Sequence, residues 1–279
     1  MTVTEWICRI CGVEQAVAAE PPKACPICTD ERQYVPPSGP AWTSTERLLA
    51  EGHRLVITEM EPGLWGLRAE PKVGIGQTAL LARGTAGNLL FDVPPFVDPE
   101  ALEAMERLGG VAAILASHPH MYGAQVAWSR SLGGVPVYVA RKDLGWVQRR
   151  DPVIVAWDTS FEPVPGIWAS QVGGHFPGQT VAHWRGADDS GVLLAGDACS
   201  VRPDGNVSFQ RSYPNMIPMS PRGVRQIVDV MAEVDANFYR KLTDKEWEQF
   251  TEDMINGGLR KLDPHSEYLN AEQLERFRS

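Results

Sequence analysis

The alternation of hydrophobic and polar residues along the first third of the chain predicts paired strands. Runs of β-forming residues at 53–60 and 64–70 flank a Pro-Gly turn, which is typical of a hairpin. The segments 78–84 ("TALLARG") and 88–93 ("NLLFDV") have the same character and predict a second strand pair.

Further along the chain, predicted strands alternate with helices. The segment 98–110 predicts a helix, with Asp98 as its N-cap, Pro99 at its first position and Gly109 at its end. A continuous apolar run at 111–118 predicts a buried strand, and 123–133 and 221–234 have helical spacing. Other strands are predicted at 135–140, 153–157, 167–174, 180–184 and 191–197. The order favours an α/β fold with helices outside two sheets.

Four cysteines near the N-terminus form two Cys-x-x-Cys pairs: Cys8 with Cys11, and Cys25 with Cys28. Two tight turns with two thiolates each can close a tetrahedron around one metal ion. The alternative is four unrelated buried cysteines. A unit of about 30 residues has too small a core to fold alone, so the metal would supply most of its stability. The "CRICG" and "CPIC" knuckles resemble rubredoxin-like domains and zinc ribbons, which implies zinc, with iron possible.

Composition narrows the function only by exclusion. The chain has 279 residues and a formal net charge of −9, which argues against a nucleic-acid partner. No apolar run approaches the ~20 residues that cross a bilayer, and the N-terminus lacks the features of a signal peptide. Cysteines grouped in metal-binding spacing favour a reducing compartment, so we expect a cytoplasmic protein without a membrane partner.

Three segments share one pattern, an apolar strand that runs into His or Asp beside small residues. They carry His118 and His120 in "ILASHPH", His175 in "VGGHFPGQT" and Asp197 in "LLAGDACS". Polar side chains at strand ends are how α/β folds usually build sites. Three neutral imidazoles and a carboxylate are a competent ligand set for Zn²⁺ or Fe²⁺.

These motifs, in this order, resemble the metallo-β-lactamase fold family over roughly residues 52–235. "NLLFDV" also lies where the family has an early strand that ends in Asp. The resemblance implies an αβ/βα four-layer sandwich with the metal site at one edge of the two sheets. It also implies hydrolytic, thioester-cleaving or redox activity at one or two metals. We therefore expect three parts: a four-cysteine metal ribbon at 1–36, the main domain at 37–236 and a helical extension at 237–279.

The chain departs from the family pattern after the second histidine. The family usually reads His-x-His-x-Asp-His, and its last two residues bind the second metal; this chain has Tyr122 and Gly123 there. What remains is the first-metal set, so we expect a mononuclear centre. Asp197 is the expected base or fourth ligand. Tyr122 is a candidate donor to a developing oxyanion, or simply a side chain packed beside the site.

Three functions are compatible with this site. The first is a hydrolase that acts on a small ester, thioester or lactone. The second is a metal-binding scaffold without catalysis. The third is an iron-dependent persulfide oxidation, for which His118, His175 and Asp197 would form a triad like that of some mononuclear relatives.

The C-terminal stretch and three other residues have simpler expectations. "INGGLRKLDPHSEYLNAEQLERF" resembles the helical segment near the N-terminus of carboxyl-terminal processing peptidases, without their catalytic part, so it implies no protease. We expect a helical extension that packs on the main domain or on a second copy of the chain, with His265 as a structural residue. Cys199 is expected to be a small buried residue, and His183 a surface residue of a strand.

Overall fold

The computed structural model describes residues 3–187, 191–201 and 206–238 of the chain. The expected helical extension falls almost entirely outside these ranges, as does His265. The expected boundaries of the three parts stay predictions.

The larger of two facing sheets is mixed, and its strand order follows the chain order β3-β4-β5-β6-β7-β8-β9. Neighbours are antiparallel from β3 to β6 and parallel from β6 to β9. The strands are β3 (Arg54–Glu61), β4 (Leu64–Glu70), β5 (Thr78–Gly84), β6 (Gly87–Phe91), β7 (Val111–Leu115), β8 (Val137–Ala140) and β9 (Ile154–Trp157). The two strand pairs predicted from the sequence are thus confirmed as neighbours in one sheet.

The smaller sheet is antiparallel, in the order β10-β11-β12-β13. Its strands are β10 (Ser160–Val164), β11 (Ile167–Gln171), β12 (Thr180–Trp184) and β13 (Val192–Leu194). Short two-stranded pairs join β1 (Ile7–Cys8) to β2 (Trp42–Thr43), β14 (Ser200–Val201) to β15 (Val207–Ser208), and β16 (Gln210–Ser212) to β17 (Ile217–Pro218). The sequence did not indicate β10 or these short pairs.

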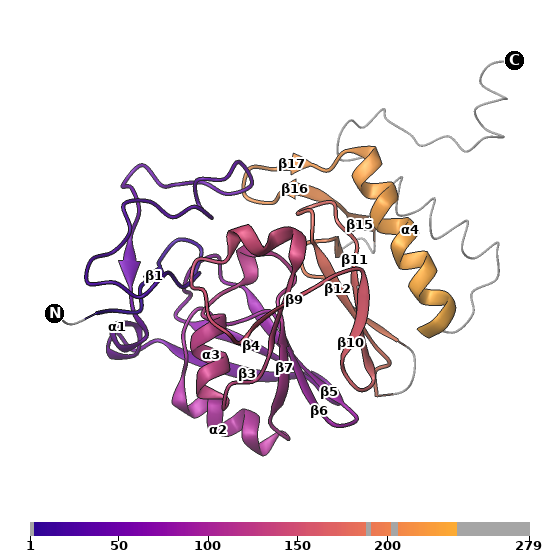
Figure 1. Ribbon diagram of the computed structural model, residues 1–279, viewed down its shortest axis with the longest axis horizontal. Coiled ribbons are helices and arrows are strands. Elements are labelled where there is room, and N and C mark those ends of the chain that lie inside the picture. The colour runs from indigo at the N-terminus through magenta and orange to yellow at the C-terminus, as the bar shows by residue number, and fades with distance from the viewer. Residues whose placement is uncertain (1–2, 188–190, 202–205, 239–279) are drawn as a thin grey trace, which may run out of the picture.

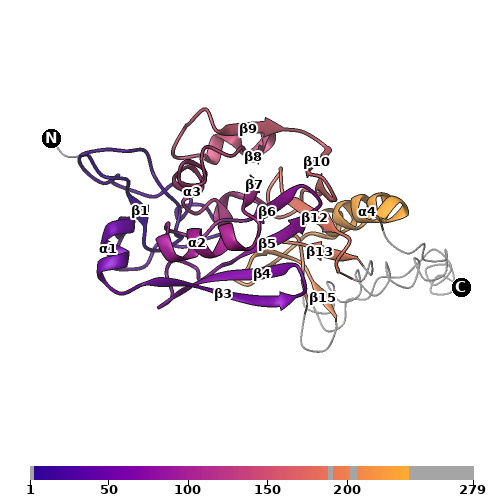
Figure 2. The ribbon, with the colours of Figure 1, turned by 90° about the horizontal axis from the view of Figure 1, so that it is seen from below.

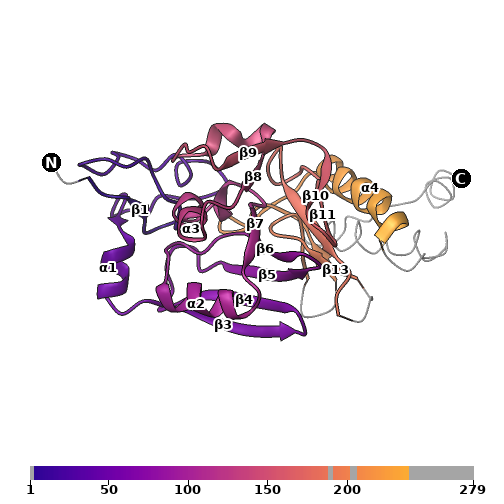
Figure 3. The ribbon, with the colours of Figure 1, turned by 60° about the horizontal axis from the view of Figure 1, so that its bottom comes forward.

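Helices cover the outer faces of both sheets, so the described chain forms the expected αβ/βα layers. α2 (Pro99–Arg107) and α3 (Gln125–Ser131) lie against the larger sheet, whereas α4 (Pro221–Phe238) lies against the smaller one. Figures 2 and 3 show these layers from the side, with α1 (Thr45–Ala50) near the N-terminal segment. Two 3-10 helices, η1 (Pro119–Met121) and η2 (Arg141–Trp146), follow β7 and β8.

Asp98 is the N-cap of α2, as predicted. One oxygen of its carboxylate accepts the N–H of Glu100 at 3.0 Å. The other accepts the N–H of Leu55 at 2.7 Å, which ties the helix to β3.

Alternation along the strands explains why their sequences are apolar on both faces. Leu89 and Phe91 of β6 point into the core between the sheets, whereas Leu90 points toward the helices. On the other side of the smaller sheet, Val181 packs with Ile227 of α4. No helix in the described part of the chain is long and apolar enough to cross a lipid bilayer.

Candidate metal centres

Four predicted ligands from distant segments meet at one edge of the sandwich. His118 follows the buried strand β7. The 3-10 helix η1 begins directly after His118 and contains His120. His175 lies in the turn between β11 and β12, and Asp197 follows β13. One ligand atom from each residue lies within 4.8 Å of those of the other three, and we call these four residues the His/Asp cluster.

The ligand atoms of the His/Asp cluster face a common point. Oδ2 of Asp197 lies 3.2 Å from Nε2 of His118 and 3.6 Å from Nε2 of His175. Nε2 of His175 lies 3.3 Å from Nδ1 of His120. The three imidazole rings meet edge to face, with centroids 4.9–5.2 Å apart.

Burial distinguishes the carboxylate from the histidines. The His118 and His175 side chains are 0% and 1% exposed, whereas the Asp197 side chain is 30% exposed. Burial lowers the pKa of His175 to about 4 and that of His120 well below its usual value, so both rings are neutral. Burial would raise the pKa of Asp197, but the three neighbouring histidines outweigh it and lower this pKa to about 2. Asp197 is therefore ionised and lies on the open side of the cluster.

Second contacts fix the orientation of two of the rings. Nδ1 of His175 lies 3.0 Å from the carbonyl oxygen of Gln210, which can only accept, so Nδ1 carries the proton and Nε2 keeps its lone pair. Nδ1 of His118 lies 2.8 Å from the hydroxyl of Ser117. The N–H of Ser117 in turn donates to the carboxylate of Asp92 at 2.8 Å. Asp92 is the aspartate of "NLLFDV", the segment where the family has an early strand that ends in Asp.

The donor set fits a divalent cation. Nε2 of His118 is buried and makes no hydrogen bond, although it lies close to the Asp197 carboxylate. Burying acceptor nitrogens and a carboxylate side by side, with no donor between them, costs free energy unless a cation binds there. Three nitrogens and one oxygen are a common ligand set for zinc and are also compatible with iron.

Tyr122 and Gly123 occupy the positions of the family's second-metal ligands but do not provide ligand atoms. The Tyr122 hydroxyl donates to the backbone carbonyl of Asp143 at 3.2 Å, and burial raises its pKa well above the usual value. Gly123 has φ +49°, and a Cβ there would lie 2.3 Å from the carbonyl oxygen of Val93. This geometry favours Tyr122 as a side chain packed beside the site, not as a donor to an oxyanion.

The four cysteines also converge, and we call them the four-cysteine cluster. Sγ of Cys8 lies 3.6 Å from that of Cys28, and Sγ of Cys11 lies 3.7 Å from that of Cys25. All four are buried and none forms a disulfide. Zinc–thiolate bonds of about 2.3 Å in a tetrahedron place the sulfurs about 3.8 Å apart, which these distances match. The structure thus supplies a second possible metal-binding group.

Two minor expectations meet different outcomes. His183 was expected on the surface of a strand, and this is wrong: it is 1% exposed, on the face of β12 that also carries Val181 and lies toward α4. Strand alternation alone did not distinguish a solvent face from one covered by a later helix. Cys199 is partly buried, and burial raises the pKa of its thiol to about 11, so it stays protonated at neutral pH.

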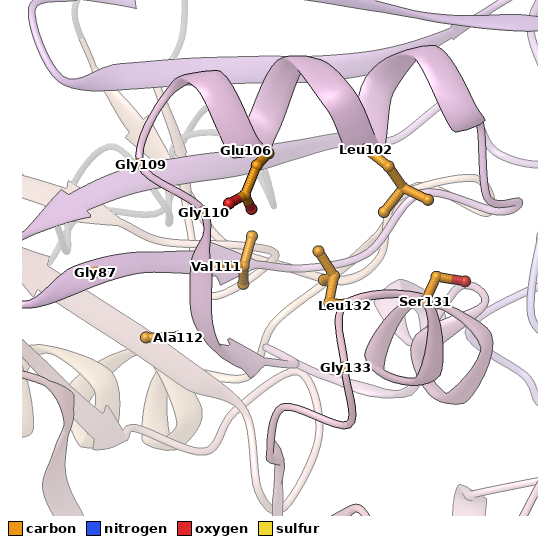
Figure 4. A pocket seen from close by; sticks show the side chains of 10 residues that line it. All are labelled: Gly87, Leu102, Glu106, Gly109, Gly110, Val111, Ala112, Ser131, Leu132 and Gly133. Carbon is orange, nitrogen blue, oxygen red and sulfur yellow. The ribbon is translucent and has the colours of Figure 1, made fainter.

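A hollow of about 410 Å³ lies at the other end of β7 from the histidines. Figure 4 shows it between α2 and the end of α3, lined largely by glycine backbone and apolar side chains, with the Glu106 carboxylate at its edge. The hollow has no histidine or cysteine among its lining residues and belongs to neither cluster.

Two charged residues from the N-terminal segment contact parts of the chain that adjoin the His/Asp cluster, and the sequence did not indicate either. Nη1 of Arg32 donates to the carbonyl oxygen of His175 at 3.1 Å, and its guanidinium lies 3.7 Å from the centre of the Phe176 ring. Glu14 accepts N–H groups from Val126 and Ala127, in the first turn of α3. In the sequence, both resemble ordinary solvated charges.

Comparison with known proteins identifies a relative in Bacillus subtilis. The chain is 38% identical to the uncharacterised protein YmaE of Bacillus subtilis over 226 residues, which is 80% of this chain and 82% of that protein. No protein-family model matches the chain.

Solved structures with a similar arrangement include metallo-β-lactamases. FIM-1 of Pseudomonas aeruginosa, in its mono-zinc form, is 16% identical with a TM-score of 0.49, over 72% of this chain and 94% of that one. An enzyme from Pontibacter korlensis is 15% identical with a TM-score of 0.49, over 72% of this chain and 99% of that one.

Proposed function

The chain belongs to the same family as YmaE, and we propose that it is a hydrolase with one catalytic metal ion. Its metallo-β-lactamase fold, which metal-dependent hydrolases share, supports this proposal. The observation that carries this proposal is the convergence of His118, His120, His175 and Asp197, with an ionised carboxylate on the open side. We propose zinc for this cluster and for the four-cysteine cluster.

Gly123 supports a mononuclear centre. The family's second metal needs ligands at the positions of Tyr122 and Gly123. Here the phenol is held by a backbone carbonyl, and the glycine packs against Val93 and Pro94 too closely for a side chain. Among the described residues, no further His, Cys, Asp or Glu groups with these four as a possible metal ligand.

The metal would supply Lewis acidity: it polarises a carbonyl oxygen and lowers the pKa of a water molecule to about 7. The protein's own part lies with the side chains. The proton on Nδ1 of His175 is held by the Gln210 carbonyl, which keeps Nε2 free to bind the metal. Asp197 is ionised and partly exposed, so its carboxylate can complete the ligand set and orient a water molecule beside it.

We propose a small ester, thioester or lactone as the substrate class. A carbonyl compound of this kind has one electrophilic carbon. One Lewis acid can polarise its oxygen, and one carboxylate can orient the attacking water. A single metal with Asp197 beside it provides this set.

The test is hydrolysis by the zinc-loaded protein across a panel of thioesters, aryl esters and lactones. Activity should be lost in His118→Ala and in Asp197→Asn. It should be retained in His53→Ala, because His53 lies outside both clusters. Zinc-loaded protein that hydrolyses none of the panel would favour a scaffold, and iron-loaded protein that takes up oxygen with a persulfide would replace the hydrolase by an oxidation.

A further inference from the structure

The four-cysteine cluster and the His/Asp cluster are joined by two short routes through the chain. Each Cys-x-x-Cys knuckle is followed within four residues by a buried charged side chain: Glu14 after Cys11, and Arg32 after Cys28. Glu14 contacts the segment that follows His120, and Arg32 contacts the backbone of His175.

The first route holds the segment that carries His118 and His120. The N–H of Glu14 donates to the carbonyl of Gly123 at 2.9 Å, three residues after His120. The Glu14 carboxylate accepts the N–H groups of Val126 and Ala127, which otherwise lack partners at a helix N-terminus. Glu14 is 3% exposed, and burial raises the pKa of its carboxyl to about 7, although Arg149 at 3.0 Å and the N–H donors partly offset this.

The second route holds His175. Nη1 of Arg32 donates to the His175 carbonyl, while Nε and Nη2 of the same guanidinium engage both carboxylate oxygens of Asp30. The carbonyl of Arg32 accepts the Ser212 hydroxyl at 2.9 Å. Ser212 lies in β16, whose Gln210 carbonyl holds Nδ1 of His175. His175 is therefore held on its backbone and on its ring by parts fixed to the second knuckle.

A continuous hydrophobic core also links the four-cysteine cluster to the strands and helix beside the His/Asp cluster. The four cysteines belong to one core with Leu90, Ile114 and Trp128, which lie in β6, β7 and α3. A metal held by all four thiolates would cross-link the two knuckles and so fix the backbone from which Glu14 and Arg32 extend. When that metal leaves, Glu14 and Arg32 lose their fixed positions, and the His/Asp cluster loses two supports.

We propose that metal occupancy of the four-cysteine cluster sets the metal affinity of the His/Asp cluster, with Glu14 and Arg32 as the positioning residues that couple them. This coupling rests on the proposed function only in that both clusters bind metal. It makes the His/Asp cluster responsive to the zinc supply of the four-cysteine cluster. Linkage requires the effect to be reciprocal, so filling the His/Asp cluster strengthens binding at the cysteines by the same factor.

The test is a cobalt titration of the full-length apo protein, read by absorption. Thiolate-to-cobalt charge transfer reports the cysteines, and the weaker visible bands report the His/Asp cluster. We expect Arg32→Met, which removes a contact to His175, to lower cobalt affinity at the His/Asp cluster by about 10–100-fold, the usual effect of losing an outer contact to a ligand. Glu14→Gln acts only through the first turn of α3 and should lower this affinity by less. The thiolate band should be retained. Arg9→Met, which removes a pair with Glu51, and Glu20→Gln, at an exposed side chain, are the matched controls.

Unchanged affinity at the His/Asp cluster in Arg32→Met and in Glu14→Gln, with the cysteines loaded, would overturn the coupling. In the reciprocal arm, His118→Ala should weaken the cysteine site, and Arg32→Met should abolish this effect. The readout needs no substrate, so it separates the two proposals. Coupled sites in a protein that hydrolyses nothing would refute the hydrolase alone, and independent sites in an active enzyme would refute the coupling alone.

Discussion

Replacing Gly123 by alanine tests why this chain lacks a second metal ligand. A left-handed φ of +49° costs a residue with a side chain about 1–2 kcal/mol. The new Cβ would also lie 2.3 Å from the Val93 carbonyl oxygen and 2.7 Å from that of Pro94. These are backbone atoms, so a segment must move, and overpacking of this kind adds about 1–3 kcal/mol. We expect Gly123→Ala to lower the free energy of unfolding by about 2–5 kcal/mol.

Gly133→Ala is the matched control, because Gly133 has φ +85° but a Cβ at that position would have no neighbouring atom within 4 Å. It should carry the backbone cost alone, about 1–2 kcal/mol. Urea denaturation of both zinc-loaded variants, with unchanged m-values, measures the difference. Equal stability of the two variants would refute the steric argument. So would a Tyr122→Asp/Gly123→His variant that folds as well as the parent and binds one additional metal ion.

Three further predictions concern buried groups around the His/Asp cluster. Asp92→Asn keeps an acceptor for the Ser117 N–H but removes a charge near His118, so zinc affinity measured by chelator competition should fall roughly tenfold; unchanged affinity would contradict this. Burial raises the pKa of Asp143 to about 6, so its ionisation costs stability as pH rises from about 4 to 6. The Tm of Asp143→Asn relative to the parent should therefore rise over that window and then level off, and a constant difference would refute it. His175→Ala should lose one metal ion and leave the cysteine-bound ion in place, as measured by elemental analysis.

The sequence predicted the parts of the site that depend on local pattern. Apolar runs ending in His118, His175 and Asp197 placed the ligands at strand ends, and strand ends meet at one edge of such a fold. Cysteine spacing predicted the second cluster in the same way, because each pair needs only its own tight turn.

Features that depend on distant neighbours could not be predicted. Arg32 is buried because its partners include a carbonyl 143 residues away in sequence, and nothing in "TDERQ" indicates this. His183 has the polar–apolar alternation of a surface strand, but helix α4 lies against that sheet. The direction of the Tyr122 hydroxyl was equally open, because the carbonyl of Asp143 that holds it belongs to another segment.

Zinc content of the purified protein decides whether each cluster binds one metal ion. We expect two zinc ions per chain, one for each cluster, and one in His118→Ala/His175→Ala, with the remaining ion released by a thiol-modifying reagent. Three ions in the parent protein would contradict the mononuclear centre. Two ions retained in the double variant would show that the His/Asp cluster is not a metal site.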